Sequence, residues 1–319
     1  MGNITQVLCD RKYFKWWYFD IHCNSGLDIV LIFHVQPFFS NFDIGLVDIV
    51  VYKKNSKIIH RTIVSPIKKC TIVDRPLSLY IGTATMTTKS DAIFCHVDDS
   101  NIKLHLEFKS EAVTRKTLME PICVFDGMQT EFWWQVKYPR INAAGFLCCD
   151  GENITIEGIG YHDCNWGTVS LPRHLDYWNW GRYLLNDEVF IYATVRDRQK
   201  CLWAFSMHVN GNGEQHMEHY RYNQLDDAQK FLTETMKCEI VHTSHHVIDE
   251  DMIFISPLSR KFRFINKIAE FMFFRLKESR IFKPMCVSLS NVNYKRIKKH
   301  FYYKGQYSEN SVHEEMRMR

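Results

Sequence analysis

Several features that mark common protein classes are missing from this chain of 319 residues. It has no glycine-rich phosphate loop, no nucleophile elbow and no Walker pattern, so nothing points to a nucleotide-binding or serine-hydrolase site. The net charge is only +4, and no arginine-rich block or zinc-finger spacing accompanies it. We therefore expect no nucleic-acid partner.

Signals for export and for membrane insertion are also missing. The first twenty residues lack the charged-then-apolar order of a signal peptide, and no apolar run reaches membrane-spanning length. The eleven cysteines are odd in number, scattered, and include no Cys-x-x-Cys, which favours reduced thiols over a disulfide framework. These absences predict a cytoplasmic protein, soluble or attached only peripherally to a membrane.

Aromatic and strand-forming residues are what the chain has in quantity. Hydrophobic residues make up 46% and aromatic residues 14% of the sequence, which suits a packed core and a site for a hydrophobic ligand. Short β-prone runs alternate with turn signals such as Asp150-Gly151 and Asn210-Gly211. The pattern predicts an all-β protein with few short helices.

The predicted organisation is two β-rich domains, 1–170 and 171–305, followed by a polar tail, 306–319. The boundary falls where Pro172 interrupts the strands. Helices are expected only at 225–236 and within 258–280. The second has an apolar stripe among seven lysines and arginines, which fits packing on a barrel or contact with a membrane surface.

Three motifs carry a family resemblance: KWWYFD (15–20), GIGYHDCNWG (158–167) and YWNWGRY (177–183). Together they resemble the carotenoid 1,2-hydratase and AttH-like superfamily, which also includes fungal lipocalin-like Diels-Alderases. The resemblance implies two tandem lipocalin-like β-barrels with a ligand cavity at or between them. It is specific at these motifs and extends to the rest of the chain only in layout.

Asp163 is the candidate acid of the central motif. A carboxyl enclosed by aromatic side chains has its charged form disfavoured, so its pKa rises and it can hold a proton near neutral pH. Such an acid can protonate a carbon–carbon double bond, and indole and phenol rings can stabilise the resulting carbocation. The resemblance gives this role to Asp163, with Tyr161 beside it. The competing interpretation is that Asp163 and Asn165 cap a turn through backbone amides.

The candidate substrate-binding residues are mostly aromatic. Trp178 and Trp180 share one strand face with Arg182, and one of Trp16 and Trp17 should face the core. The short segment between the second and third motifs places both near the domain junction, a favoured location for ligands. The full predicted set is Trp17, Trp134, His162, Asn165, Trp166, Trp178 and Trp180.

The chain departs from the family pattern in one place. The hydratases carry His-x-Trp before a proline, whereas the matching segment here is WWQVKYP, with Trp134 and Val136 before Pro139. The histidine that could position or activate water is missing. Its absence favours protonation followed by cyclisation or isomerisation over hydration.

Three functions follow from these observations. The first is an enzyme that protonates a hydrophobic polyene or isoprenoid from Asp163, giving cyclisation, isomerisation or hydration. The second is a pericyclase that acts by folding its substrate, and the third is a non-catalytic lipid or pigment binder. No cofactor or metal is expected, since the histidines near 216–219 and 242–246 lack a convincing ligand set.

Overall fold

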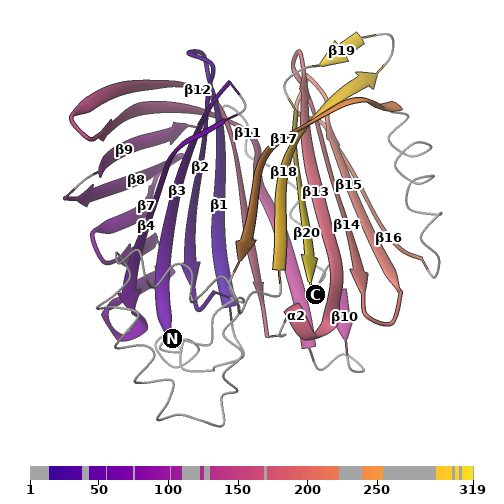
Figure 1. The fold of residues 1–319 in the computed structure, drawn as a ribbon, viewed down its shortest axis with the longest axis horizontal. Helices are drawn as coiled ribbons and strands as arrows, with labels where there is room; N and C mark the ends of the chain where they lie inside the picture. Colours follow the sequence, from indigo (N-terminus) through magenta and orange to yellow (C-terminus); the bar gives the residue numbers. More distant parts are fainter. Residues whose placement is uncertain are drawn as a thin grey trace. The chain divides into compact units, whose positions relative to one another are not determined.

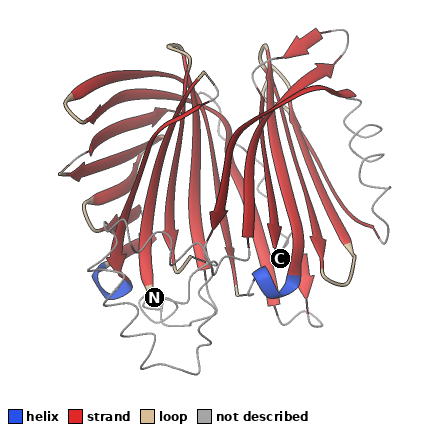
Figure 2. Ribbon diagram, in the orientation of Figure 1, coloured by secondary structure: helices blue, strands red, loops and turns tan. Residues whose placement is uncertain are grey.

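The computed structural model describes most of the chain as β-strands (Figure 1; Figure 2). The residues it describes are 14–37, 43–54, 56–74, 76–100, 102–109, 123–125, 130–168, 171–222, 239–253, 292–303, 306–308 and 311–318. Within these ranges the helices are one 3-10 turn, η1 (Ile67–Lys69), and one short helix, α2 (Leu171–His174). The all-β prediction is confirmed. The helices predicted at 225–236 and within 258–280 lie outside the described residues.

The chain divides into two compact units. Unit 1 is built from the described parts of 1–37, 43–121 and 132–168, and unit 2 from those of 122–131 and 169–319. The predicted division into independent domains at 170 stays a prediction. Among the described residues, no helix has the length and apolar character needed to cross a membrane.

Unit 1 contains one large antiparallel sheet, with strand order β4-β3-β2-β1-β12-β11-β9-β8-β7-β6-β5. Its strands are β1 (Phe14–Cys23), β2 (Leu27–Val35), β3 (Ile44–Lys53), β4 (Ser56–Pro66), β5 (Thr71–Asp74), β6 (Leu77–Ile81), β7 (Ala84–Lys89), β8 (Ala92–Asp99), β9 (Ile102–Lys109), β11 (Thr130–Cys149) and β12 (Glu152–Gly167). The predicted hairpin at Asp150-Gly151 joins β11 to β12, and both turn residues have positive φ, 52° and 84°. These values suit the asparagine-, aspartate- and glycine-rich turns of two-residue hairpins.

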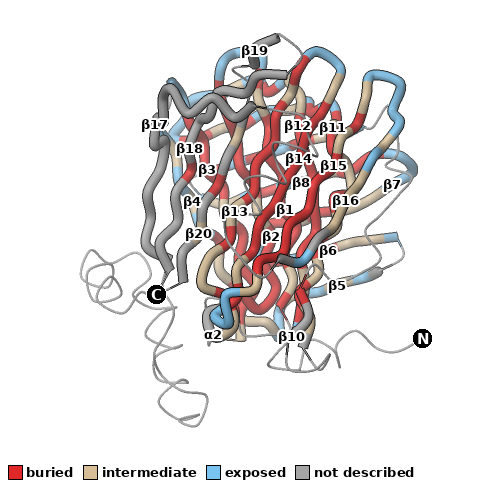
Figure 3. The backbone as a smooth tube through the Cα atoms, turned by 90° about the vertical axis from the view of Figure 1, so that its right-hand side faces the viewer, coloured by how far each residue is buried: buried red, intermediate tan, exposed pale blue. Residues whose placement is uncertain are grey.

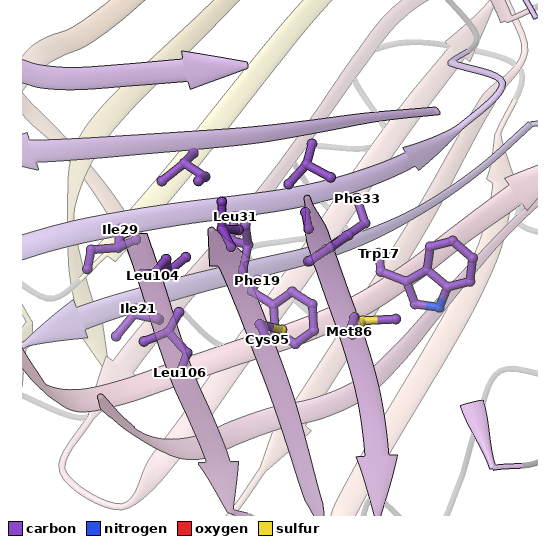
Figure 4. Close-up of a cluster of buried hydrophobic side chains, with 14 of the residues drawn as sticks. Trp17, Phe19, Ile21, Ile29, Leu31, Phe33, Met86, Cys95, Leu104 and Leu106 are labelled. Atoms are coloured by element: carbon purple, nitrogen blue, oxygen red, sulfur yellow. The ribbon is translucent and has the colours of Figure 1, made fainter. Parts of the chain in front are cut away.

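The sheet of unit 1 curls, so that β7–β9 run across β1–β3 and enclose an apolar core (Figure 1). Figure 4 shows Phe19 and Leu31, from β1 and β2, facing Met86, Cys95 and Leu106 from β7–β9. β2 is buried on both faces, as its continuous apolar run predicts. The burial is deepest along the central strands and lowest at the hairpin ends (Figure 3).

Unit 2 has its own antiparallel sheet, with strand order β16-β15-β14-β13-β20-β18-β17. Its strands are β13 (Leu175–Leu185), β14 (Glu188–Asp197), β15 (Leu202–Val209), β16 (Gln215–Tyr222), β17 (Glu239–Ile253), β18 (Val292–Tyr303), β19 (Gln306–Ser308) and β20 (Ser311–Met318), whereas the short strand β10 (Cys123–Phe125) pairs with β11. The predicted turn at Asn210 is confirmed, because its side-chain Oδ1 accepts from the backbone N–H of Asn212 and Glu214.

The C-terminal segment corrects a prediction. In place of a polar tail from residue 306, the structure has β20 in the interior of the sheet, between β13 and β18. Glu314, which makes the segment look solvent-exposed, is buried and bonded to Arg296 and to the indole of Trp180. These partners lie on other strands, so local composition could not show them.

Candidate active site

The central motif lies on β12, a strand held between β1 and β11. The interpretation of Asp163 and Asn165 as caps of a turn is therefore wrong. The glycines of the motif serve strand packing instead, because a Cβ atom on Gly158 would stand 2.1 Å from the carbonyl oxygen of His22 on β1. Glycine at this position lets β1 and β12 approach closely and fixes their register.

Strand alternation sorts the motif onto two faces of the sheet. Tyr161, Asp163 and Asn165 lie on the face opposite to the apolar core. On β1, Tyr18 stands directly across from Asp163 and Trp16 across from Asn165. The site face of β12 and β1 is therefore polar and aromatic, yet each of these five side chains is buried.

Irregular pairing sets Trp134 directly across from Asn165. Counted from the turn at Asp150-Gly151, Asp163 would pair with Tyr138, but two register shifts near Pro139 move the pairing by two residues. Asp163 consequently pairs with Val136, and Trp134 pairs with Asn165. Proline removes a ladder hydrogen bond and β-bulges re-aim side chains, which accounts for the shift.

The carboxylate of Asp163 is the centre of the site. Its Oδ2 accepts hydrogen bonds from the Trp134 Nε1–H at 2.7 Å and the Tyr161 hydroxyl at 2.8 Å. Its Oδ1 accepts from the Asn165 Nδ2–H at 2.8 Å. Asp163 is 4% exposed, so these bonds operate away from bulk water, where charge-assisted hydrogen bonds are strongest.

The alignment of Trp134 with a histidine of the hydratase pattern stays a prediction. In the structure the indole N–H of Trp134 donates to the carboxylate of Asp163, as an imidazole N–H could. Unlike an imidazole, an indole does not accept and release a proton, so Trp134 can hold the carboxyl without exchanging a proton with it.

A second buried carboxylate lies on the same face. Asp20 pairs with Tyr161 across β1 and β12 and accepts a 3.3 Å hydrogen bond from the Tyr18 hydroxyl. The rings of Tyr18 and Tyr161 meet edge-to-face, 6.2 Å apart. Sequence reasoning missed Tyr18 and Asp20 as site residues. The available signal was the alternation of KWWYFD, which places an aspartate two positions from Tyr18 inside a buried strand.

His162, Trp166 and Trp17 lie on the opposite face of the sheet. His162 is stacked on Phe19 of the core at 4.1 Å, and its Nδ1–H donates to the backbone carbonyl of Tyr18. Burial lowers the pKa of His162 to about 3, so its ring is neutral. The structure does not bring these three predicted binding residues to the face of Asp163.

Trp17 and Trp166 are packing residues in this arrangement. Trp17 belongs to the core cluster, so the prediction that one tryptophan of the pair faces the core is confirmed. Trp166 stacks on Trp133 at 5.7 Å, and the Lys15 ammonium lies near the rings of both Trp17 and Trp166.

The third motif lies in unit 2, on β13. Trp178, Trp180 and Arg182 share one strand face, as predicted, and all three are buried. The indole N–H of Trp180 donates to Glu314 at 2.9 Å, and Arg296 holds the same carboxylate at 2.6 Å. Participation of Trp178 and Trp180 in one site with Asp163 stays a prediction.

A comparison with known protein families identifies the family of this chain. The family model for the carotenoid hydratase CrtC matches residues 68–259. The chain belongs to the carotenoid hydratase CrtC family. This confirms the resemblance read from the three motifs.

A curated relative gives a shorter match. The acyclic carotenoid 1,2-hydratase of Rhodobacter capsulatus is 39% identical over 57 residues. This covers 17% of the present chain and 20% of the relative, so only about a fifth of that enzyme is matched.

Solved structures share the fold of this CrtC-family member. An AttH candidate from Nitrosomonas europaea aligns with a TM-score of 0.56 at 11% identity, covering 95% of this chain and 92% of the other. Kievitone hydratase from Nectria haematococca aligns with a TM-score of 0.52 at 10% identity, covering 96% and 88%. CghA with Sch210972 aligns with the same TM-score and coverage at 8% identity. At these identities the likeness concerns the fold alone.

Proposed function

We propose that this CrtC-family protein is an enzyme that protonates a carbon–carbon double bond of a hydrophobic polyene or isoprenoid, with Asp163 as the general acid. Hydration, cyclisation or isomerisation can follow from the resulting carbocation. The observation that carries the proposal is the buried carboxylate held by Trp134, Tyr161 and Asn165. Proton transfer from a positioned carboxyl needs no cofactor.

The hydrogen bonds suggest which oxygen carries the proton. An indole N–H and a carboxamide N–H can only donate, so the Asp163 oxygens accept the hydrogen bonds from Trp134 and Asn165. Two of the three bonds end on Oδ2 and one on Oδ1. We therefore assign the transferred proton to Oδ1, where it leaves both bonds to Oδ2 in place.

Aromatic rings near the carboxyl suit the cation that protonation creates. Tyr18, Tyr161 and Trp134 lie on the face of Asp163 and present electron-rich rings in a buried setting. Such rings attract a cation more strongly when water is excluded. The substrate class rests on family membership and on the matched acyclic carotenoid hydratase. We accordingly propose an acyclic polyene.

Asp163→Asn tests the role of the acid, because it keeps the shape of the side chain and removes the transferable proton. Turnover of an acyclic carotenoid such as lycopene should fall about 100- to 10,000-fold, the range of general acid catalysis. Binding, followed by quenching of tryptophan fluorescence, should change little. Asp28→Asn is the matched control. Asp28 is also buried in unit 1, but it lies on β2 and its carboxylate bonds to His22 of β1 at 2.6 Å.

The two other functions predict different results from these variants. A pericyclase would keep most of its rate in Asp163→Asn, because substrate folding supplies the rate acceleration. A carrier would return the polyene chemically unchanged from wild type and variant alike.

A further inference from the structure

The side-chain amide of Asn165 lies beside the carboxyl of Asp163. Asn165 is 1% exposed, and its Nδ2–H is committed to Asp163. Its Oδ1 is buried and finds no hydrogen-bond donor among the residues that the structure describes. On the neighbouring strands, its pairing partners are Trp16 and Trp134.

The orientation of this amide follows from its partner. When Asp163 is ionised, turning the side chain by 180° would set its oxygen against the carboxylate Oδ1 of Asp163, and neither oxygen could donate. The nitrogen therefore faces Asp163, and Oδ1 is left for a donor. A buried acceptor without a donor is costly, so such atoms in native proteins call for an explanation.

We infer that Asn165 Oδ1 accepts a hydrogen bond from the O–H of the water that adds to the substrate, so that Asn165 is the residue that positions this water. The inference rests on the proposed function of Asp163. It differs from the sequence-based expectation, which disfavours hydration because a histidine is missing near Trp134. Asn165 supplies an acceptor for water next to the acid instead.

The steps balance with water as the only co-reactant. Asp163 transfers the proton on Oδ1 to one alkene carbon, and the π electrons form the new C–H bond and leave the adjacent carbon cationic. The water oxygen bound to Asn165 donates a lone pair to that carbon and forms the C–O bond. The oxygen then loses one proton to Oδ1 of Asp163, which restores the acid and leaves an alcohol.

Two isotope labels separate proton transfer from water addition. Full-length protein is incubated with lycopene in detergent micelles, once in D2O and once in water enriched in oxygen-18. Deuterium in recovered polyene and product reports protonation, and oxygen-18 in the alcohol reports water addition. Asn165→Leu has similar volume and no acceptor. In this variant, we expect the rate of oxygen-18 incorporation into the alcohol to fall at least about tenfold more than the rate of deuterium incorporation. A factor of about ten corresponds to the loss of one hydrogen bond.

Asn165→Asp is the second variant, because it keeps an acceptor oxygen at the same place and can share a proton with Asp163. This variant should keep the wild-type ratio of oxygen-18 incorporation to deuterium incorporation even if its overall rate is low. Equal loss of both labels in Asn165→Leu would show that Asn165 only holds Asp163, and would overturn the inference. Deuterium without oxygen-18 in the wild type would also overturn it, while leaving the proposed function intact. A wild type that incorporates neither label contradicts the proposed function itself.

Discussion

The indole N–H of Trp134 on β11 donates a 2.7 Å hydrogen bond to Oδ2 of Asp163 on β12, although the two residues are 29 positions apart in the chain. The bond depends on the register shifts near Pro139, which align Trp134 with Asn165. The bond holds the carboxyl of Asp163 in one orientation, so the proposed proton transfer depends on this irregularity of the strand pairing. Removing the donor is therefore the first test of the arrangement.

Trp134→Phe keeps a ring at this position and removes the N–H. The loss of a hydrogen bond to a charged group should cost about 1.5–3 kcal/mol in the transition state, or roughly a 10- to 100-fold decrease in kcat/KM. Steady-state kinetics on lycopene measure the effect. Trp133→Phe is the control, since Trp133 stacks on Trp166 at the other face and should keep most activity. Equal losses in the two variants would argue against a special role for the Trp134 indole.

Tyr161→Phe removes the second donor to Oδ2 while leaving the fully buried ring in place. We expect kcat to fall about tenfold, as for the loss of one good hydrogen bond, with a smaller change in KM. Tyr18→Phe removes a hydroxyl from the neighbouring ring, whose bond to Asp20 is longer at 3.3 Å. Its activity should stay near that of wild type. A larger loss in Tyr18→Phe than in Tyr161→Phe would shift the catalytic centre toward Asp20.

His162→Gln tests the placement of His162 in the core. The pKa of His162 is about 3 in the fold, below its ordinary value of 6.5, because burial disfavours the charged ring. Its contribution to stability is therefore present above pH 6.5 and is lost as the pH falls from 6.5 toward 3, by at most about 1.4 kcal/mol per unit. Urea unfolding between pH 4 and 7 should show a shallower pH dependence in the variant.

The same variant bears on substrate binding. Since His162 lies on the face opposite to Asp163, the KM of the variant for lycopene at pH 7 should match that of the wild type. A pH dependence of stability identical to that of the wild type would contradict a buried neutral histidine.

Glu314→Gln tests the anchoring of β20. The carboxylate of Glu314 bonds to Arg296, which is fully buried, and to the Trp180 indole. Removing its charge takes this counter-ion from a buried guanidinium, which should cost about 3–5 kcal/mol of unfolding free energy. Glu188→Gln removes a part-buried partner of His208 in the same unit and should cost at most about 1 kcal/mol. Chemical unfolding followed by circular dichroism gives both values, and similar costs would contradict the anchoring role.

The strands and turns of this fold are largely predictable because their signals are local. The hairpin at Asp150-Gly151 and the continuous burial of β2 follow from neighbouring residues alone. The motif of Asp163 is harder, since its glycines suggest a loop until Gly158 is seen against the β1 backbone. β20 could not be predicted, because the partners of its buried glutamate, Trp180 and Arg296, lie on other strands.

The candidate site also has a part that local sequence predicts and a part that depends on strand pairing. Tyr161, Asp163 and Asn165 share a face by simple alternation, and that alternation also separates them from His162 and Trp166. The place of Trp134 requires the two register shifts, which counting from the turn does not give. Tertiary pairing, more than residue type, decides which aromatic side chains meet the carboxyl.

Solvent deuterium incorporation into lycopene, compared between wild type and Asp163→Asn, tests the central claim most directly. A general acid at Asp163 predicts that the wild type in D2O places one deuterium on a single alkene carbon, since the carboxyl proton exchanges with solvent before transfer. The variant, still folded and still binding the polyene, should place none. A variant that forms the wild-type product with the same deuterium content and rate would contradict the assignment of Asp163 as the acid.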